Sequence, residues 1–199
     1  MERDTHVVAL CGSLRDESRT RVALRTALDA AADAGATTEL VDLREYDLPP
    51  LDPDAPTPAD AEALGRTVAD ADAVLLGTPN YHGSYAGHLK NALDHLGLDE
   101  FGGKLVGLLE VAGGSYPKPA LAHLRAVCRT LNAWTHPLEV GIPNASSTVG
   151  LDGIDDDAVR DRVRELGREL TEYAGVESYP ELAARRSDRA EPLAGAHGE

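Results

Sequence analysis

The chain has 199 residues, 42% of them hydrophobic, which is enough to bury the core of one domain of ordinary size. Its 19 lysines and arginines face 34 aspartates and glutamates, and the net charge of −15 disfavours a nucleic-acid partner. No apolar run reaches the roughly eighteen residues of a membrane-spanning helix, and the first six residues do not resemble a secretory signal. We therefore expect a soluble, cytoplasmic protein without a membrane partner.

The acidic residues are spread along the chain rather than gathered in one tail, and the only lysines are Lys90, Lys104 and Lys118. One interpretation is a solvated, highly charged acidic surface. A second hypothesis is adaptation to a high-salt cytoplasm, as in a halophile, because salt screens the repulsion among surface charges. Refolding in molar salt after unfolding in low salt would support the second hypothesis.

Apolar runs of about five residues alternate along the chain with longer segments whose apolar side chains recur at helical spacing. The predicted strands are 7–11, 38–42, 73–77, 105–111 and a weaker one at 138–142. The predicted helices are 18–34, 58–69, 86–96, 119–134 and 156–174. This alternation is typical of an α/β protein with parallel strands and crossover helices.

Two segments fall outside this alternation. Residues 46–58 contain five prolines and several aspartates, which predicts a surface loop with an acidic rim. Residues 177–199 show no sustained apolar pattern, so we expect a C-terminal tail that is loosely held or packs on a partner subunit. Residues 1–176 would then form the folded domain.

Five strands with right-handed crossovers most simply form a doubly wound sheet in three layers. In the flavodoxin-like order 2-1-3-4-5, the strand order reverses between the first and third strands. Ligands bind outside the carboxyl ends of the strands at that point. The loops after the first and third predicted strands should therefore lie side by side.

The loop after the first strand, residues 12–20, is rich in hydroxyl and guanidinium groups. Ser13, Ser18 and Thr20 can donate hydrogen bonds, and Arg15 and Arg19 can pair with a phosphate dianion at the start of the following helix. The loop lacks both the ending of a P-loop and the G-x-G-x-x-G pattern, which disfavours an ATPase or a dinucleotide dehydrogenase. In the alternative interpretation, Ser18 only caps the helix and the arginines are solvated.

The loop sequences resemble those of the NADPH-dependent FMN reductase family, flavodoxin-like flavoproteins that include chromate, quinone and azo-dye reductases. The resemblance covers residues 6–175 and is strongest at Gly12-Ser13-Leu14-Arg15 with Ser18, at residues 78–84 and at residues 89–94. The family more often has Glu at position 80 and often has Asn at position 82, where this chain has Asn80 and His82.

The resemblance implies an FMN site made of three loops. Because bound FMN would carry the hydride chemistry, we expect no catalytic side chain, and we expect no metal. The residues implied to hold the FMN phosphate are Ser13, Arg15, Ser18 and Thr20. Those implied to line the ribityl chain and the edge of the isoalloxazine ring are Pro79, Asn80, Tyr81, His82 and Gly83. A third loop, implied to lie against the ring, contains Ala112, Gly113, Gly114, Ser115 and Tyr116. His82 would modulate the flavin by hydrogen bonding.

The function implied is that of an oxidoreductase in which NADPH or NADH reduces bound FMN, which then reduces a small-molecule acceptor. The acceptor could be free flavin, a quinone, an azo compound or a metal oxyanion. The resemblance also implies a homodimer or homotetramer whose interface adds walls to the flavin pocket. Two alternatives remain open: an electron carrier of the flavodoxin type, and a non-catalytic module that binds another phosphorylated ligand.

Several other residues have simpler interpretations. We expect Cys11 and Cys128 to be small buried hydrophobes, and Trp134, at the end of a predicted helix, to lie in the core. Lys90 and Asp94 are four residues apart and should pair on a helix surface. The remaining histidines lack the spacing of metal ligands.

Overall fold

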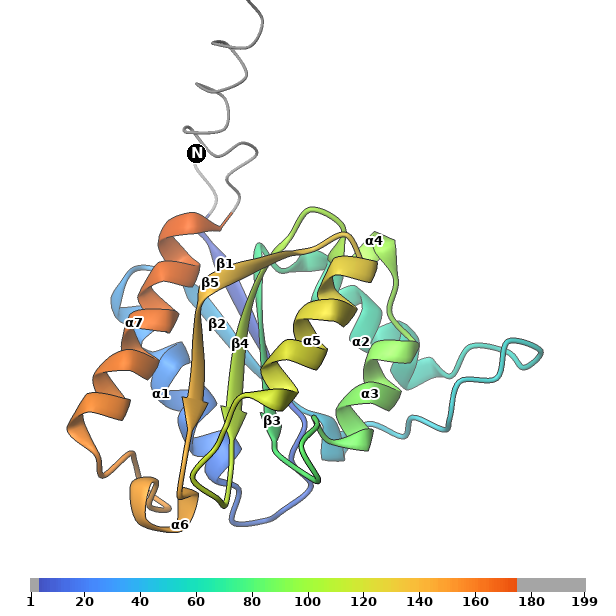
Figure 1. Ribbon diagram of the computed structural model, residues 1–199. Coiled ribbons are helices and arrows are strands. Elements are labelled where there is room, and N and C mark those ends of the chain that lie inside the picture. Colours follow the sequence, from blue (N-terminus) through green and yellow to red (C-terminus); the bar gives the residue numbers. More distant parts are fainter. Residues whose placement is uncertain (1–3, 175–199) are drawn as a thin grey trace, which may run out of the picture.

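The structure is a computed structural model that describes residues 4–174. Its strands are parallel and form one five-stranded sheet in the order β2-β1-β3-β4-β5 (Figure 1). The strands are β1 (His6–Cys11), β2 (Thr37–Asp42), β3 (Ala73–Pro79), β4 (Leu105–Val111) and β5 (Trp134–Ile142). This is the flavodoxin-like order predicted from the sequence. The tail expected at 177–199 lies outside the described residues.

Helices cover both faces of the sheet and make the structure three layers deep (Figure 1). α1 (Arg19–Asp33) and α7 (Asp157–Tyr173) pack on one face. α2 (Ala59–Asp70), α3 (Gly87–Asp94), α4 (Leu98–Phe101) and α5 (Pro119–Thr130) pack on the other. Two short elements, η1 (Leu43–Glu45) and α6 (Ala145–Thr148), follow the ends of β2 and β5. No helix among the described residues is both long enough and apolar enough to cross a membrane.

The prediction of one helix over residues 119–134 was wrong at its carboxyl end. α5 ends at Thr130, and Asn132 adopts the left-handed conformation with φ 56°. The amide of Trp134 then donates to the carbonyl of Lys104, which starts β5 earlier than predicted. The Trp134 side chain is 51% exposed, so its expected place in the core was wrong too.

Other expectations agree with the structure. Residues 46–58 form neither helix nor strand, and Lys90 forms an ion pair with Asp94 on the surface of α3. Cys11 and Cys128 are both buried free thiols, and burial raises the pKa of Cys128 to about 12. The helix predicted at 86–96 is shorter, and the separate helix α4, which begins after Gly97, was not anticipated.

α1 and α7 approach each other so closely that one helix must lack a side chain at the crossing. A Cβ atom at Gly167 in α7 would lie 1.9 Å from the main-chain oxygen of Ala27 in α1. Backbone atoms of a packed helix cannot move aside at low cost. By contrast, a Cβ at Gly65 in α2 would find its nearest neighbour, an oxygen of Glu100, at 3.5 Å.

We predict opposite effects of alanine at these two helical glycines. Helix propensity alone favours Ala over Gly by about 1 kcal/mol, so Gly65→Ala should raise the free energy of unfolding. At Gly167 the steric clash outweighs this gain, and Gly167→Ala should lower the free energy of unfolding by about 1–3 kcal/mol. Urea unfolding of both variants measures this, and equal effects at the two positions would contradict the packing described for α1 and α7.

Candidate functional site

Three loops meet at the carboxyl edge of the sheet. They follow β1, β3 and β4, which are neighbours in the sheet, and they span residues 12–18, 80–86 and 112–118. The amide of Gly12 donates to the carbonyl of Gly77 at 2.8 Å, and the amide of Asn80 donates to the carbonyl of Val111 at 2.9 Å. These bonds join the strand ends, so the topology brings together the three segments that the sequence singled out.

The first loop offers buried hydroxyl groups and the amino end of α1. Ser13, Ser18 and Thr20 are at most 3% exposed. Ser18 is the N-cap of α1, and its Oγ accepts from the amide of Arg21 at 3.1 Å. The amides of the first two helical residues, Arg19 and Thr20, have no acceptor within the helix. Such amides, together with the helix dipole, form a site suited to an anion.

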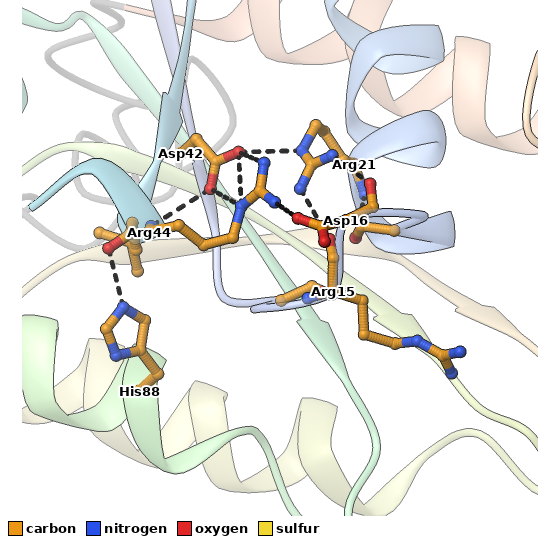
Figure 2. Close-up of polar contacts among 9 residues, drawn as sticks. Arg15, Asp16, Arg21, Asp42, Arg44 and His88 are labelled. Carbon is orange, nitrogen blue, oxygen red and sulfur yellow. Dashed lines mark hydrogen bonds and ion pairs between the residues drawn. The ribbon is translucent and has the colours of Figure 1, made fainter.

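The first loop is held by two arginines that the sequence analysis did not identify (Figure 2). The guanidinium of Arg21 donates to the main-chain oxygens of Arg15 and Asp16, both at 2.9 Å. Arg44, in η1 just after β2, donates through Nη1 to the Asp16 carboxylate at 2.8 Å. The loop is therefore held from α1 and from η1 at once.

Asp42, the last residue of β2, joins these two arginines. Arg44 donates to both of its carboxylate oxygens, with Nε 3.0 Å from Oδ1 and Nη2 2.7 Å from Oδ2. Arg21 Nε lies 3.0 Å from Oδ2, close enough for an ion pair but without the alignment of a hydrogen bond. Burial alone would raise the pKa of Asp42, but the hydrogen bonds from Arg44 and the charges of both arginines outweigh it and lower that pKa.

The Arg15 side chain does not take part in this network. Figure 2 shows it extending away from Asp42 while its main-chain carbonyl remains bound by Arg21. Arg15 is exposed, and no ion pair of its guanidinium is found among residues 4–174. Its charge is therefore available to a ligand at the mouth of the loop.

The second loop begins with a tight hairpin. Tyr81 and Ser84 exchange main-chain hydrogen bonds of 3.0 and 3.1 Å, and the two residues between them have positive φ angles, 54° at His82 and 79° at Gly83. Two left-handed residues in succession are typical of a type I′ turn. The turn leaves His82 exposed at its tip and Tyr81 51% exposed beside it.

A buried carboxylate fixes this hairpin. Glu110, in β4, is fully buried, and it accepts from the Asn80 side chain through Oε1 and from the amide of Leu121 through Oε2. Asn80 Oδ1 in turn accepts from the amide of Gly83 at 3.0 Å. Leu121 lies in the first turn of α5, where a negative charge is stabilised by the helix dipole. Asn80 therefore links the hairpin to β4 and to α5.

The third loop presents bare main chain. The amide of Asn144 donates to the carbonyl of Gly114 at 2.9 Å, and the amide of Ala145 donates to the carbonyl of Ala112 at 2.9 Å, which fixes both ends of this stretch. A Cβ added at Gly113 or Gly114 would meet no atom within 4 Å. Ala112 is buried, Ser115 is exposed, and Tyr116 is 70% exposed. A flat ligand can thus lie directly against the two glycines.

α3 holds the base of the proline-rich loop next to this edge. His88 Nε2 lies 2.8 Å from the carbonyl of Leu43, Asn91 donates to the carbonyl of Leu48, and His95 Nε2 lies 2.8 Å from the carbonyl of Pro49. His88 and Asn91 lie in α3 and His95 caps its end, and their spacing of three and four places them on one face.

Within the described part of the chain, no cluster of three or more metal-ligating side chains is present.

Comparison with known proteins gives both a family and a set of relatives. The family model described as NADPH-dependent FMN reductase matches residues 5–147. The FMN-dependent NADPH-azoreductase of Staphylococcus aureus (strain USA300) is 32% identical over 182 residues, covering 87% of this chain and 97% of the relative.

Among solved structures, the flavoenzyme NAD(P)H:(acceptor) oxidoreductase FerB from Paracoccus denitrificans has a TM-score of 0.73 at 21% identity, covering 85% of this chain and 96% of FerB. The two-electron reduced flavodoxin of Megasphaera elsdenii has a TM-score of 0.60 at 18% identity, covering 83% of this chain and 98% of the flavodoxin. At these identities the structural matches establish the flavodoxin-like fold alone.

The lowered pKa of Asp42 predicts an acid-sensitive contribution to stability. A carboxyl whose folded pKa is below its ordinary value of 3.8 contributes stability above that value and loses it as the pH falls through the folded pKa. Asp42→Asn should therefore be less stable than the unchanged protein at pH 7, and the difference should shrink as the pH falls from about 5 toward 2. Urea unfolding across this range measures the difference. Asp29→Asn, an exposed change on α1, is the control, and a difference for Asp42→Asn that is constant with pH would refute the prediction.

Removing the Asn80 side chain should loosen the hairpin. In Asn80→Ala, the buried Glu110 loses one donor and the amide of Gly83 loses its acceptor, so we expect about 1–3 kcal/mol of destabilisation and faster hydrogen exchange at Gly83. His82→Asn, at the exposed tip, keeps a residue that tolerates positive φ and should change stability by less than about 0.5 kcal/mol. Unchanged exchange at Gly83 in Asn80→Ala would contradict the proposed link.

Proposed function

Because the chain belongs to the NADPH-dependent FMN reductase family, we propose that it is an FMN-dependent oxidoreductase that passes reducing equivalents from NAD(P)H to a small acceptor. The observation that supports this most strongly is the meeting of three loops at one sheet edge, one with an anion site and one with bare glycines. A phosphate joined to a flat ring system matches both features.

The first loop would hold the FMN phosphate. Buried hydroxyl groups of Ser13, Ser18 and Thr20 lie in or next to the start of α1, and Arg15 adds an exposed positive charge. The Ser18 Oγ accepts from the amide of Arg21, and its O–H remains able to donate. The capping and phosphate-binding interpretations of Ser18 are therefore compatible.

The second and third loops would hold the ribityl chain and the ring. The residues assigned to the ribityl chain and the ring edge are Pro79 at the end of β3 and Asn80, Tyr81, His82 and Gly83 of the second loop. From the third loop they are Ala112, Gly113, Gly114 and Ser115. Bound FMN supplies hydride transfer in two steps, from the reduced nicotinamide and then to the acceptor. The main-chain amides of the glycines can donate to its polar edge, and His82 can add a hydrogen bond from the hairpin tip.

Because the bound cofactor would carry the hydride chemistry, the protein's part is to bind and orient the two reactants. Tyr81 and Tyr116, both more than half exposed, would provide apolar walls for nicotinamide and acceptor in turn.

Several finer properties belong to the same proposal. We propose that the acceptor is an azo compound, a quinone, a flavin or a metal oxyanion, since each could approach the exposed isoalloxazine ring of bound FMN. We place the protein in the cytoplasm as a homodimer or homotetramer, with residues 1–176 as the flavin-binding domain and 177–199 as a tail. The net charge of −15 supports an acidic surface adapted to high salt.

Anaerobic titration tests the proposal directly. The purified protein is mixed with FMN, and the absorbance of bound flavin is followed as NADPH or NADH is added. Bleaching by the nucleotide and recovery on adding a quinone or azo dye are expected. Flavin that binds but is not bleached would indicate a flavodoxin-type carrier, and a protein that ignores FMN would indicate another phosphorylated ligand.

Arg15→Ala should weaken FMN binding specifically through the phosphate. The loop main chain at this position is held by Arg21 and not by the Arg15 side chain, so the substitution removes only a charge. We expect a loss of about 1.5–3 kcal/mol in FMN affinity, measured by flavin fluorescence, with little change for riboflavin, which lacks the phosphate. Arg25→Ala, an exposed change on α1, is the control. An FMN affinity unchanged by Arg15→Ala would show that the Arg15 side chain is only solvated and does not bind the phosphate.

A further inference from the structure

A depression of the surface lies beside the end of the third loop. It has a volume of about 660 Å³, within the usual range for small-molecule sites, and it is lined by the first turns of α5, by β5 and by Arg162 of α7. In Figure 1, α5 and α7 lie on either side of the edge strand β5. We refer to it as the β5 groove.

The β5 groove is lined by more positive than negative groups. Lys118, Arg125 and Arg162 line it, and the acidic residue among them is Glu139. Arg125 neutralises Glu139, with Nη2 2.6 Å and Nε 3.1 Å from Oε1. Among residues 4–174, neither Lys118 nor Arg162 forms an ion pair. Arg162 Nη2 donates a hydrogen bond to the main-chain oxygen of Glu139 at 3.5 Å. Two positive charges are therefore available to a ligand.

This groove contrasts with the charge of the whole chain. A net charge of −15 repels anions from most of the surface. A concave site with a net positive lining attracts them locally, because a low-dielectric wall focuses the field of the fixed charges. A ligand that matches the charge and the volume of the groove carries at least two negative charges and has the size of a nucleotide.

The groove is continuous with the third loop. The carbonyl of Pro117 lies so close over β5 that a Cβ atom at Gly141 would be 2.4 Å from it, and both residues line the groove. Pro117 and Lys118 are the last residues of the third loop, which also carries the open glycines Gly113 and Gly114. One loop therefore contributes to the proposed ring site and to the groove.

We propose that the β5 groove binds the phosphorylated adenosine half of NADPH, with Lys118 and Arg162 facing its phosphate groups. The assignment rests on the proposed function, since it names where the reduced dinucleotide extends from the flavin site. The 2′-phosphate adds negative charge that NADH lacks, so the groove favours NADPH over NADH.

The test is calorimetric titration with 2′,5′-ADP, which carries the 2′-phosphate and no nicotinamide, of the protein with and without FMN. Lys118→Ala and Arg162→Ala should each raise the Kd about tenfold, the effect of about 1.4 kcal/mol. Glu139→Gln should lower the Kd, because it removes the negative charge and frees Arg125. Arg168→Ala, an exposed change on α7 outside the groove, is the matched control and should leave the Kd unchanged.

A steady-state measurement separates this site from the flavin site. Lys118→Ala and Arg162→Ala should raise KM for NADPH more than KM for NADH, while the Kd of FMN stays the same. No binding of 2′,5′-ADP, or equal Kd values in all variants, would overturn the groove assignment. FMN binding and bleaching that persist in that case would leave the proposed function intact. Binding of 2′,5′-ADP that depends on Lys118 and Arg162 in a protein that ignores FMN would overturn the proposed function instead.

Discussion

The hydrogen bond from the amide of Gly12 to the carbonyl of Gly77 joins the ends of β1 and β3 at the point where the strand order reverses. Glycine at both positions lets helices pack closely on the sheet there. A Cβ at Gly12 would lie 2.8 Å from Cβ of Leu89 in α3, and one at Gly77 would lie 2.6 Å from the side chain of Leu24 in α1. The close packing brings the first two loops together at one edge, and the geometry of the proposed flavin site depends on it.

Each loop at this edge is then fixed by a different kind of contact. The first loop is held by Arg21, which binds its main chain, and by Arg44, which binds the Asp16 carboxylate. The second is held by a buried carboxylate acting through Asn80, and the third by main-chain bonds to residues 144 and 145. All of these contacts are made between residues of the protein itself. Side chains that are already positioned lose less entropy when a ligand binds, so the arrangement favours affinity for a cofactor that stays bound through many turnovers.

The sheet could be predicted because buried parallel strands appear as continuous apolar runs, and all residues of β4 are indeed buried. The residues that hold the loops could not be predicted in the same way, because Asp42 comes near the first loop only through the pairing of β2 with β1. Glu110 did leave a signal, since one carboxylate stands within the apolar run of a buried strand. Trp134 was misplaced because the apolar spacing of α5 continues past Thr130, whereas the left-handed Asn132 ends the helix. The assignment of individual residues to FMN stays a prediction.

The central claim is that the phosphate of FMN lies at the amino end of α1 while its ring lies against the glycines of the third loop. Amide chemical shifts recorded during separate titrations with FMN and with riboflavin test it most directly. The account predicts that both ligands shift the amides of Gly113 and Gly114, whereas only FMN shifts those of Arg19 and Thr20. Equal shifts at Arg19 and Thr20 with the two ligands, or none there with FMN, would contradict it.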